Sequence, residues 1–399
     1  MRFVASADWQ LGMTAHYLDA EARPRFHHAR LEAVRRIGEL AAGCGAEFVL
    51  VCGDVFESNQ LNRSIIARTF EVLRTFTMPV VLLPGNHDAL DAASIYDSPA
   101  FSDSPPEQLH VIRDNHPFEV APGVQIVGAP WFSKHPLHDL VAEACAPLEV
   151  TTAGMTRVIA GHGAVSTLNP DRESPETIDV AALTAVLDSG RADVAVLGDR
   201  HSTTSVSSRI WYPGTPEVTA RRETDPGNAL VVDVEPSSHA VSVQKVHIGR
   251  WHFTTLEQTL TGIDDVDAVA ERLSSLPEKD CTAVWLALSG TLSTAGKARL
   301  DDVVDRAGDL FARLDYWERN TDLAVLPDQH DFSDLELSGF AREALDELIV
   351  TAGSPGPQAG TAKDALGLLY RFSGGESETG VENARRAGGG DAKRLGGES

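Results

Sequence analysis

The chain has 399 residues, of which 42% are hydrophobic, and it carries a formal net charge of −24 at pH 7. This length exceeds that of one ordinary domain, so we expect two domains or one domain with appendages. No apolar run approaches the roughly 18–20 residues that a membrane helix needs. In so acidic a protein, a basic surface that binds nucleic acid must be local, be offset by acidic faces elsewhere, or be supplied partly by bound metal and a partner.

The four cysteines form no C-x-x-C pair; they are Cys44, Cys52, Cys145 and Cys281. The sequence therefore predicts neither a zinc site nor a disulfide framework. The first eight residues turn charged too early for a signal peptide. We therefore expect a cytoplasmic protein with no membrane segment.

The first quarter of the chain alternates between strand and helix patterns. An apolar strand at residues 3–7 precedes a helical pattern over about 25–42, in which Val34 and Ile37 share one face. Apolar strands follow at residues 48–52 and 80–83. This alternation is typical of βαβ units around a mostly parallel inner sheet, and it predicts an α/β fold.

Strand patterns come closer together beyond about residue 100, and helices become sparser. The predicted strands are residues 124–130, 157–160, 194–197, 209–212, 229–234 and 241–246. A change in composition near Arg250 then marks a second region, where a helix at 266–273, a strand at 283–288 and a longer helix over 300–314 predict a small α+β domain. We place that domain at about residues 250–335.

The last part of the chain predicts two short helices and a tail. Apolar residues recur at helical spacing over 340–348 and 362–369, within residues 336–372. Residues 373–399 are rich in Gly, Ser and Glu, so we expect disorder there. Helices as short as these need a groove, a coiled coil or the preceding domain to cover their apolar faces.

A short polar group follows each of five predicted strands at its carboxyl end. These groups are Asp8 with Gln10, Asp54, Asn86 with His87, His162, and Asp199 with His201. Ligands of open α/β sheets gather beyond the carboxyl ends of strands, so these side chains are expected to converge on one site. Simpler interpretations exist for single positions, since Asp54 could cap a helix and the turn 85–88 could merely satisfy backbone groups.

The residue types in these groups favour hard or borderline divalent ions over structural zinc. A carboxylate shared by two ions holds them roughly 3.5–4 Å apart, as hydrolysis of phosphate esters requires. A nearby imidazole can protonate the leaving oxygen. The pattern therefore indicates metal-dependent phosphoryl chemistry.

At these motifs the sequence resembles the calcineurin-like metallophosphoesterases, and more narrowly the SbcD-type DNA repair nucleases. The family pattern D-x-H, G-D-x-x, G-N-H-D, G-H and G-H-x-H appears here as Asp8-x-Gln10, Gly53-Asp54-Val55-Phe56, Gly85-Asn86-His87-Asp88, Gly161-His162 and Gly198-Asp199-Arg200-His201. The motifs span about residues 1–235. The narrower likeness depends on Leu11-Gly12, on Asp54-Val55-Phe56 and on the segment 212–216.

The resemblance implies an architecture. A metallophosphoesterase sandwich of mixed sheets flanked by helices would occupy residues 1–249, and a small α+β capping and DNA-binding domain would occupy 250–335. The C-terminal helices, residues 336–372, would dock on the coiled coil of an SbcC-type SMC-like ATPase. The resemblance also favours a homodimer built through the phosphoesterase domain.

The resemblance further implies two divalent metal ions, which we expect to be Mn²⁺, with Mg²⁺ or Fe²⁺ as alternatives. One ion would be held by Asp8, Gln10, Asp54 and His201, and the other by Asp54, Asn86, His162 and Asp199. Asp54 would then bridge the two ions as a catalytic carboxylate. His87 would contact the scissile phosphate and the leaving group.

Three positions depart from the family pattern. The family has His where this chain has Gln10 and Asp199, and its nuclease branch often has His where this chain has Glu57. Gln10 offers only a neutral and weaker ligand, whereas Asp199 adds a negative charge. We therefore expect a two-metal DNA nuclease acting in DNA repair, and keep two alternatives: a phosphodiesterase or phosphatase of small nucleotides on the same fold, and a non-catalytic scaffold that has lost one metal.

Overall fold

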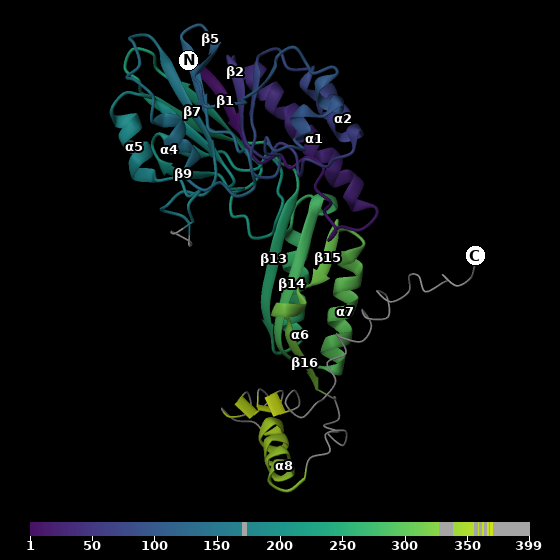
Figure 1. Ribbon diagram of the computed structural model, residues 1–399. Coiled ribbons are helices and arrows are strands. Elements are labelled where there is room, and N and C mark those ends of the chain that lie inside the picture. Colours follow the sequence, from purple (N-terminus) through teal and green to yellow (C-terminus); the bar gives the residue numbers. More distant parts are fainter. Residues whose placement is uncertain are drawn as a thin grey trace, which may run out of the picture. The chain divides into compact units, whose positions relative to one another are not determined.

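The computed structural model describes residues 1–169, 174–326 and 338–354, together with residues 358, 361, 362, 365, 366, 368 and 369. The chain divides into two compact units, Met1–Phe253 and Thr254–Ser399. Figure 1 shows both. The domain limits set from the sequence at 249, 335 and 372 stay predictions, and the tail expected over 373–399 lies outside the described residues.

Six strands of the first unit form a sheet in the order β12-β11-β1-β2-β3-β4. Their bounds are β1 Arg2–Ser6, β2 Phe48–Cys52, β3 Val80–Leu83, β4 Leu109–Val111, β11 Asn228–Val234 and β12 Val241–His247. Neighbours from β1 to β4 are parallel, whereas β11 is antiparallel to both β1 and β12. Helices α1 (Ala22–Cys44) and α2 (Arg63–Leu73) make the two connections of the predicted βαβ units.

A second six-stranded sheet has the order β5-β6-β7-β8-β10-β9. Its strands are β5 Phe118–Ala121, β6 Val124–Gly128, β7 Thr156–His162, β8 Val194–Gly198, β9 Thr204–Ser207 and β10 Ile210–Tyr212. Strands β6, β7, β8 and β10 are parallel to their neighbours in that run, and β5 and β9 are antiparallel at the edges. The helices of this half are α4 (Leu140–Cys145) and α5 (Val180–Asp188), while a 3₁₀ turn (Ile95–Asp97) and α3 (Pro99–Ser102) precede β4.

Alternating residues of each strand build separate layers of core. Phe3, Phe48 and Val81 face the partner sheet and share a cluster with Ile126, Val158 and Val196. Their neighbours Val4, Val49 and Val80 pack instead with residues of α1 and α2, and Ile159 and Ala195 pack with residues of α4 and α5. Because both faces of each sheet are covered, the inner strands are continuously apolar. The predicted class, a sandwich of mixed sheets flanked by helices, is confirmed.

The part of the second unit that precedes residue 327 is a four-stranded sheet with helices α6 and α7. Its elements are β13 His252–Leu260, α6 Ile263–Ser275, a 3₁₀ turn Lys279–Cys281, β14 Thr282–Ser293, α7 Thr294–Gly308, β15 Arg313–Tyr316, a 3₁₀ turn Glu318–Asn320 and β16 Asp322–Leu326. Strand β14 lies parallel to β15 and β16. The helix predicted over 300–314 was too long, because α7 ends at Gly308 and Leu314 belongs to β15. Phe311 and Leu314 still pack in the core of this unit. Their apolar character therefore indicates that they are buried, but it does not indicate a helix.

Helix α8 (Phe340–Gly353) is the first of the two helical patterns near the C-terminus. Its Leu345 is fully buried and clusters with Ala362 and Leu366, so part of its apolar stripe is covered within this terminal segment. Phe340 and Val350 remain 85% and 69% exposed. Of the helices in the described part of the chain, none has the length and apolarity to cross a bilayer.

Candidate metal centre

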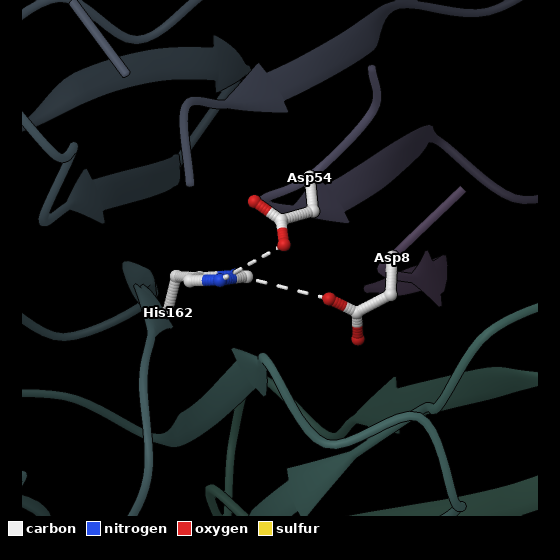
Figure 2. A group of neighbouring side chains, drawn as sticks. All are labelled: Asp8, Asp54 and His162. Atoms are coloured by element: carbon white, nitrogen blue, oxygen red, sulfur yellow. Dashed lines mark ion pairs between the residues drawn. The ribbon is translucent and has the colours of Figure 1, made fainter. Parts of the chain in front are cut away.

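The carboxyl edges of the two sheets meet at a buried group of three side chains, Asp8, Asp54 and His162. They come from the loop after β1, the loop after β2 and the last residue of β7, and Figure 2 shows them pointing toward one another. One potential ligand atom from each lies within 4.8 Å of the others. The convergence expected of these three strand ends is therefore present.

The loops that carry the two aspartates are hydrogen-bonded to each other. Asp8 N donates to Gly53 O at 3.0 Å, Gln10 N to Asp54 O at 2.8 Å, and Leu11 N to Val55 O at 2.9 Å. The two loops thus continue side by side beyond the parallel strands β1 and β2. This pairing sets the separation of Asp8 and Asp54 without help from side chains.

Four residues expected at the site have left-handed backbones. The φ angles are 52° for Asp8, 42° for Gln10, 52° for Asp54 and 89° for Asp199. Each such residue costs about 1–3 kcal/mol and persists only where its surroundings hold it. Strain of this kind concentrates at functional sites, and four of the seven non-glycine residues with positive φ in the described part of the chain belong to the motifs; the other three are Ala15, His239 and Glu278.

His162 is oriented from both sides of its ring. Its Nδ1 lies 3.0 Å from the Cys52 carbonyl oxygen and therefore donates to it, while Nε2 lies 2.7 Å from Asn86 Oδ1 and 3.6 Å from Asp54 Oδ2. Burial disfavours the charged ring, but the Asp54 and Asp8 carboxylates outweigh it and raise the pKa of His162 to about 9. The ring is therefore a cation at neutral pH, and a metal would take the place of its Nε2 proton.

Asp8 provides the test of whether these residues suit a metal. Its Oδ1 accepts a hydrogen bond from Asp199 N at 3.0 Å, but its Oδ2 is buried with no hydrogen-bond partner among the described residues. Burial raises the pKa of Asp8 to about 7, against the opposing charges of His201 and His162. A buried carboxylate oxygen without a donor is stabilised by a proton or by a bound cation, so the donor set fits a divalent ion.

Asp54 lies between the ring of His162 and the turn after β3. Its Oδ1 accepts a hydrogen bond from His87 N at 2.9 Å. Its Oδ2 is 4.0 Å from His87 Nε2, and His87 Nδ1 lies 2.9 Å from the carbonyl oxygen of Glu57. The side chain of His87 is 37% exposed, so His87 stands at the open side of the triad.

The remaining candidates do not join the buried triad. His201 Nδ1 lies 2.9 Å from Glu223 Oε1 and 2.7 Å from Thr219 Oγ1, so in the neutral ring Nδ1 holds the proton and Nε2 is an acceptor. Nε2 faces the Gln10 amide nitrogen at 3.2 Å. Asp199 is exposed and reaches Asp8 only through its backbone N–H. Their assignment as ligands stays a prediction.

Several residues that hold the site were not identified from the sequence. Asp88 accepts hydrogen bonds from Gly85 N, Phe56 N and the Tyr96 hydroxyl, and so ties the loop after β3 to the loop after β2. The indole N–H of Trp131 donates to His162 O at 2.8 Å. Asp88 lies in the turn 85–88, for which the sequence already allowed a role in satisfying backbone groups, and its contacts with Gly85 N and Phe56 N confirm that role for this residue. Trp131 and Glu223 had no signal in the sequence.

The sequence model of the calcineurin-like phosphoesterase family matches residues 1–231, more than half of the chain. A search of curated proteins found no match.

Three solved structures show a distant likeness. TT1561 of Thermus thermophilus is 10% identical, with 62% of this chain and 98% of that chain covered and a TM-score of 0.38. The purple acid phosphatase PPD1 of yellow lupin seeds is 12% identical, with 62% and 51% covered and a TM-score of 0.40. A dimetal phosphatase from Danio rerio is 13% identical, with 62% and 96% covered and a TM-score of 0.37.

Replacing Asp54 with Asn should weaken Mn²⁺ binding by at least about 100-fold. Loss of a residue that only hydrogen-bonds to a metal ligand typically costs about 10–100-fold, and here the central carboxylate itself is lost. Calorimetric titration would measure this. Asp114→Asn removes the same charge at an exposed position outside the site motifs and serves as the comparison, with an expected change within about threefold because exposed charges are screened. Equal losses in the two variants would show that the overall charge, and not the carboxylate of Asp54, sets the affinity.

Metal affinity should rise with pH, because the raised pKa values of His162 and Asp8 mean that protons occupy the metal-free site. We expect the Mn²⁺ dissociation constant to fall about tenfold per pH unit from 7 to 8.5, as one proton is displaced, and more steeply below pH 7. Titrations in two buffers of different protonation enthalpy would count the released protons. A dissociation constant that is independent of pH would contradict the protonated triad.

Proposed function

Since the chain belongs to the calcineurin-like phosphoesterases, we propose that it is a two-metal DNA nuclease of the SbcD type that hydrolyses phosphodiesters in DNA repair. The observation that supports this most directly is the buried triad of Asp8, Asp54 and His162, with His87 at its open side. Asn86 would add an amide oxygen beside His162 Nε2. We expect Mn²⁺, because oxygen donors outnumber imidazoles in this set.

The chemistry can be divided among the residues. Bound divalent ions would supply a nucleophilic water at neutral pH and neutralise charge on the phosphate. Asp8, Asp54 and His162 would hold the ions. His87 Nδ1 donates to the Glu57 carbonyl oxygen at 2.9 Å, so Nε2 carries no proton in the neutral ring. Nε2 would therefore contact the phosphate or protonate the leaving oxygen in the doubly protonated ring, which holds a proton on both nitrogens.

A DNA substrate is supported by exposed cations that neighbour residues of the site in the sequence. Arg200 lies between Asp199 and His201, Arg222 directly precedes Glu223, and Lys134 lies in the loop after Trp131; all three side chains are exposed. Phe132 in the same loop is 53% exposed, beside a buried Trp131 that is bonded to His162. Cations that meet phosphates and an exposed aromatic ring that stacks on bases are the usual means of binding single strands.

One contact favours a second candidate, the scaffold with a depleted metal site. The Gln10 amide donates to His201 Nε2 in the neutral ring, and this nitrogen is the one that an ion would need. Wild-type protein that retains fewer than two divalent ions per chain would support the scaffold over the nuclease.

We also propose that the protein acts in the cytoplasm, as a homodimer, with an SbcC-type SMC-like ATPase. Exposed apolar residues on α8, such as Phe340 and Val350, support a docking role for the terminal segment. Leu345 does not contribute to that role, because it is buried against Ala362 and Leu366.

The nuclease proposal predicts Mn²⁺-dependent digestion of labelled linear DNA. His87→Ala should lower turnover by about 10²–10⁴-fold, as expected for loss of acid or positioning help, while bound metal is retained. His116→Ala, at an exposed His between β4 and β5, is the matched control. Hydrolysis of a generic phosphodiester without any cleavage of DNA would favour the small-nucleotide alternative, and metal loss in His87→Ala would make His87 a ligand.

Removal of residues 336–399 should leave an enzyme that hydrolyses a small phosphodiester but no longer binds the ATPase. The reason is that Leu345 packs within the terminal segment, in a cluster separate from the core of the second unit. Co-purification with the ATPase and thermal unfolding would be measured on both forms. Unfolding of the truncated protein would show that these helices stabilise the preceding domain.

A further inference from the structure

Arg30 interrupts the buried face of α1. The positions that this helix buries include Phe26, Val34 and Ile37, all apolar, yet Arg30 lies on the same face and is 2% exposed. Burial of a guanidinium costs free energy unless hydrogen bonds compensate it, and an apolar side chain would suit this position better. A polar residue that breaks the pattern of a helix often does so for function.

The guanidinium donates to main-chain carbonyl oxygens of two separate loops. Nη2 and Nε lie 2.5 Å and 3.2 Å from Trp9 O, and Nη1 lies 3.1 Å from Glu217 O and 3.2 Å from Val218 O. One planar guanidinium therefore links, by hydrogen bonds, two segments that are more than 200 residues apart in the sequence. Arginine suits this task because its donors form a fixed planar fork.

Both of these loops carry residues of the candidate centre. Trp9 lies between Asp8 and Gln10, two residues whose backbones are left-handed. Val218 precedes Thr219, whose hydroxyl lies 2.7 Å from His201 Nδ1. The hydrogen bond to Trp9 O restrains the backbone of the left-handed residues Asp8 and Gln10 on either side of Trp9. The hydrogen bond to Val218 O restrains the loop that orients His201.

We propose that Arg30 is a positioning residue of the metal centre, which sets the distance between the loop of Asp8 and Gln10 and the loop that orients His201. It acts through the backbone and not by contact with metal or substrate. This inference rests on the proposed function in requiring that the centre binds metal, but it does not depend on which phosphoester is hydrolysed.

Arg36 offers a matched control on the same helix. Its Nη2 lies 3.8 Å from Glu217 Oε2 and its Nε donates to Ile248 O at 2.7 Å. It therefore contacts the neighbourhood of Arg30 but neither Trp9 nor Val218. Arg36→Met should change stability without changing metal affinity.

The test is calorimetric Mn²⁺ titration of the full chain as wild type, Arg30→Met, Arg30→Lys and Arg36→Met, with melting temperatures of the metal-free proteins. Lysine keeps the charge and the long stem but offers a compact ammonium in place of the fork, so it should fold even if the methionine variant does not. We expect the dissociation constant to rise about 10–100-fold in the Arg30 variants, the range for partners outside the ligand shell, and to stay within about threefold in Arg36→Met.

The possible results separate the inference from the proposed function. Folded Arg30→Lys with wild-type Mn²⁺ affinity would overturn the positioning role and leave the proposed function intact. An equal loss of affinity in Arg36→Met would also overturn it, because a general loss of stability would then explain the effect. Wild type that binds no Mn²⁺ would overturn both proposals.

Discussion

The hydrogen bond from His162 to the Cys52 carbonyl oxygen joins the carboxyl edges of the two inner sheets, and the rest of the centre depends on it. It requires an unusually close approach. A Cβ on Gly198 would lie 1.7 Å from Cys52 O, and one on Gly53 would lie 2.0 Å from His162 Nδ1. Because both positions are glycine, β7 can bring His162 against the end of β2. The imidazole from one sheet thereby reaches the carboxylates of the other.

Several backbone hydrogen bonds hold the left-handed residues in the loops that carry Asp8 and Asp54. Asp8 and Asp54 adopt the same left-handed φ of 52° in two loops that hydrogen-bond to each other. Asp88 fixes the third loop through Gly85 and Phe56. A strained conformation persists when several independent contacts each hold the residue in it. Burial of apolar side chains on both faces of each sheet stabilises the sandwich and so offsets the free energy that this strain costs.

Local patterns in the sequence predicted what local physics controls. Continuous apolar runs at 48–52 and 80–83 predicted buried parallel strands, and polar residues at their ends predicted a shared site. Contacts between distant segments left no such pattern. Glu223 orients His201, and Arg30 donates hydrogen bonds to Trp9 O and Val218 O. The residues next to Glu223 and Arg30 in the sequence form no pattern that predicts these contacts. Asp199 shows a subtler limit. A strand end places a residue at the edge of the sheet, but its φ of 89° then decides where the side chain points, and here the side chain is exposed.

The charge of the centre gives a physical reason for its composition. Two carboxylates buried together would repel each other, and the structure relieves this in two ways. The ring of His162 lies within 4.0 Å of Asp8 Oδ1 and 3.6 Å of Asp54 Oδ2, and burial raises the pKa of Asp8 to about 7. With His162 charged and Asp8 partly protonated, the metal-free centre is close to neutral. Divalent ions would replace those protons with positive charge, so the filled centre would attract a phosphoester even though the chain as a whole carries −24. An acidic protein would then bind an anionic substrate because the attraction arises at the ions and not over its whole surface.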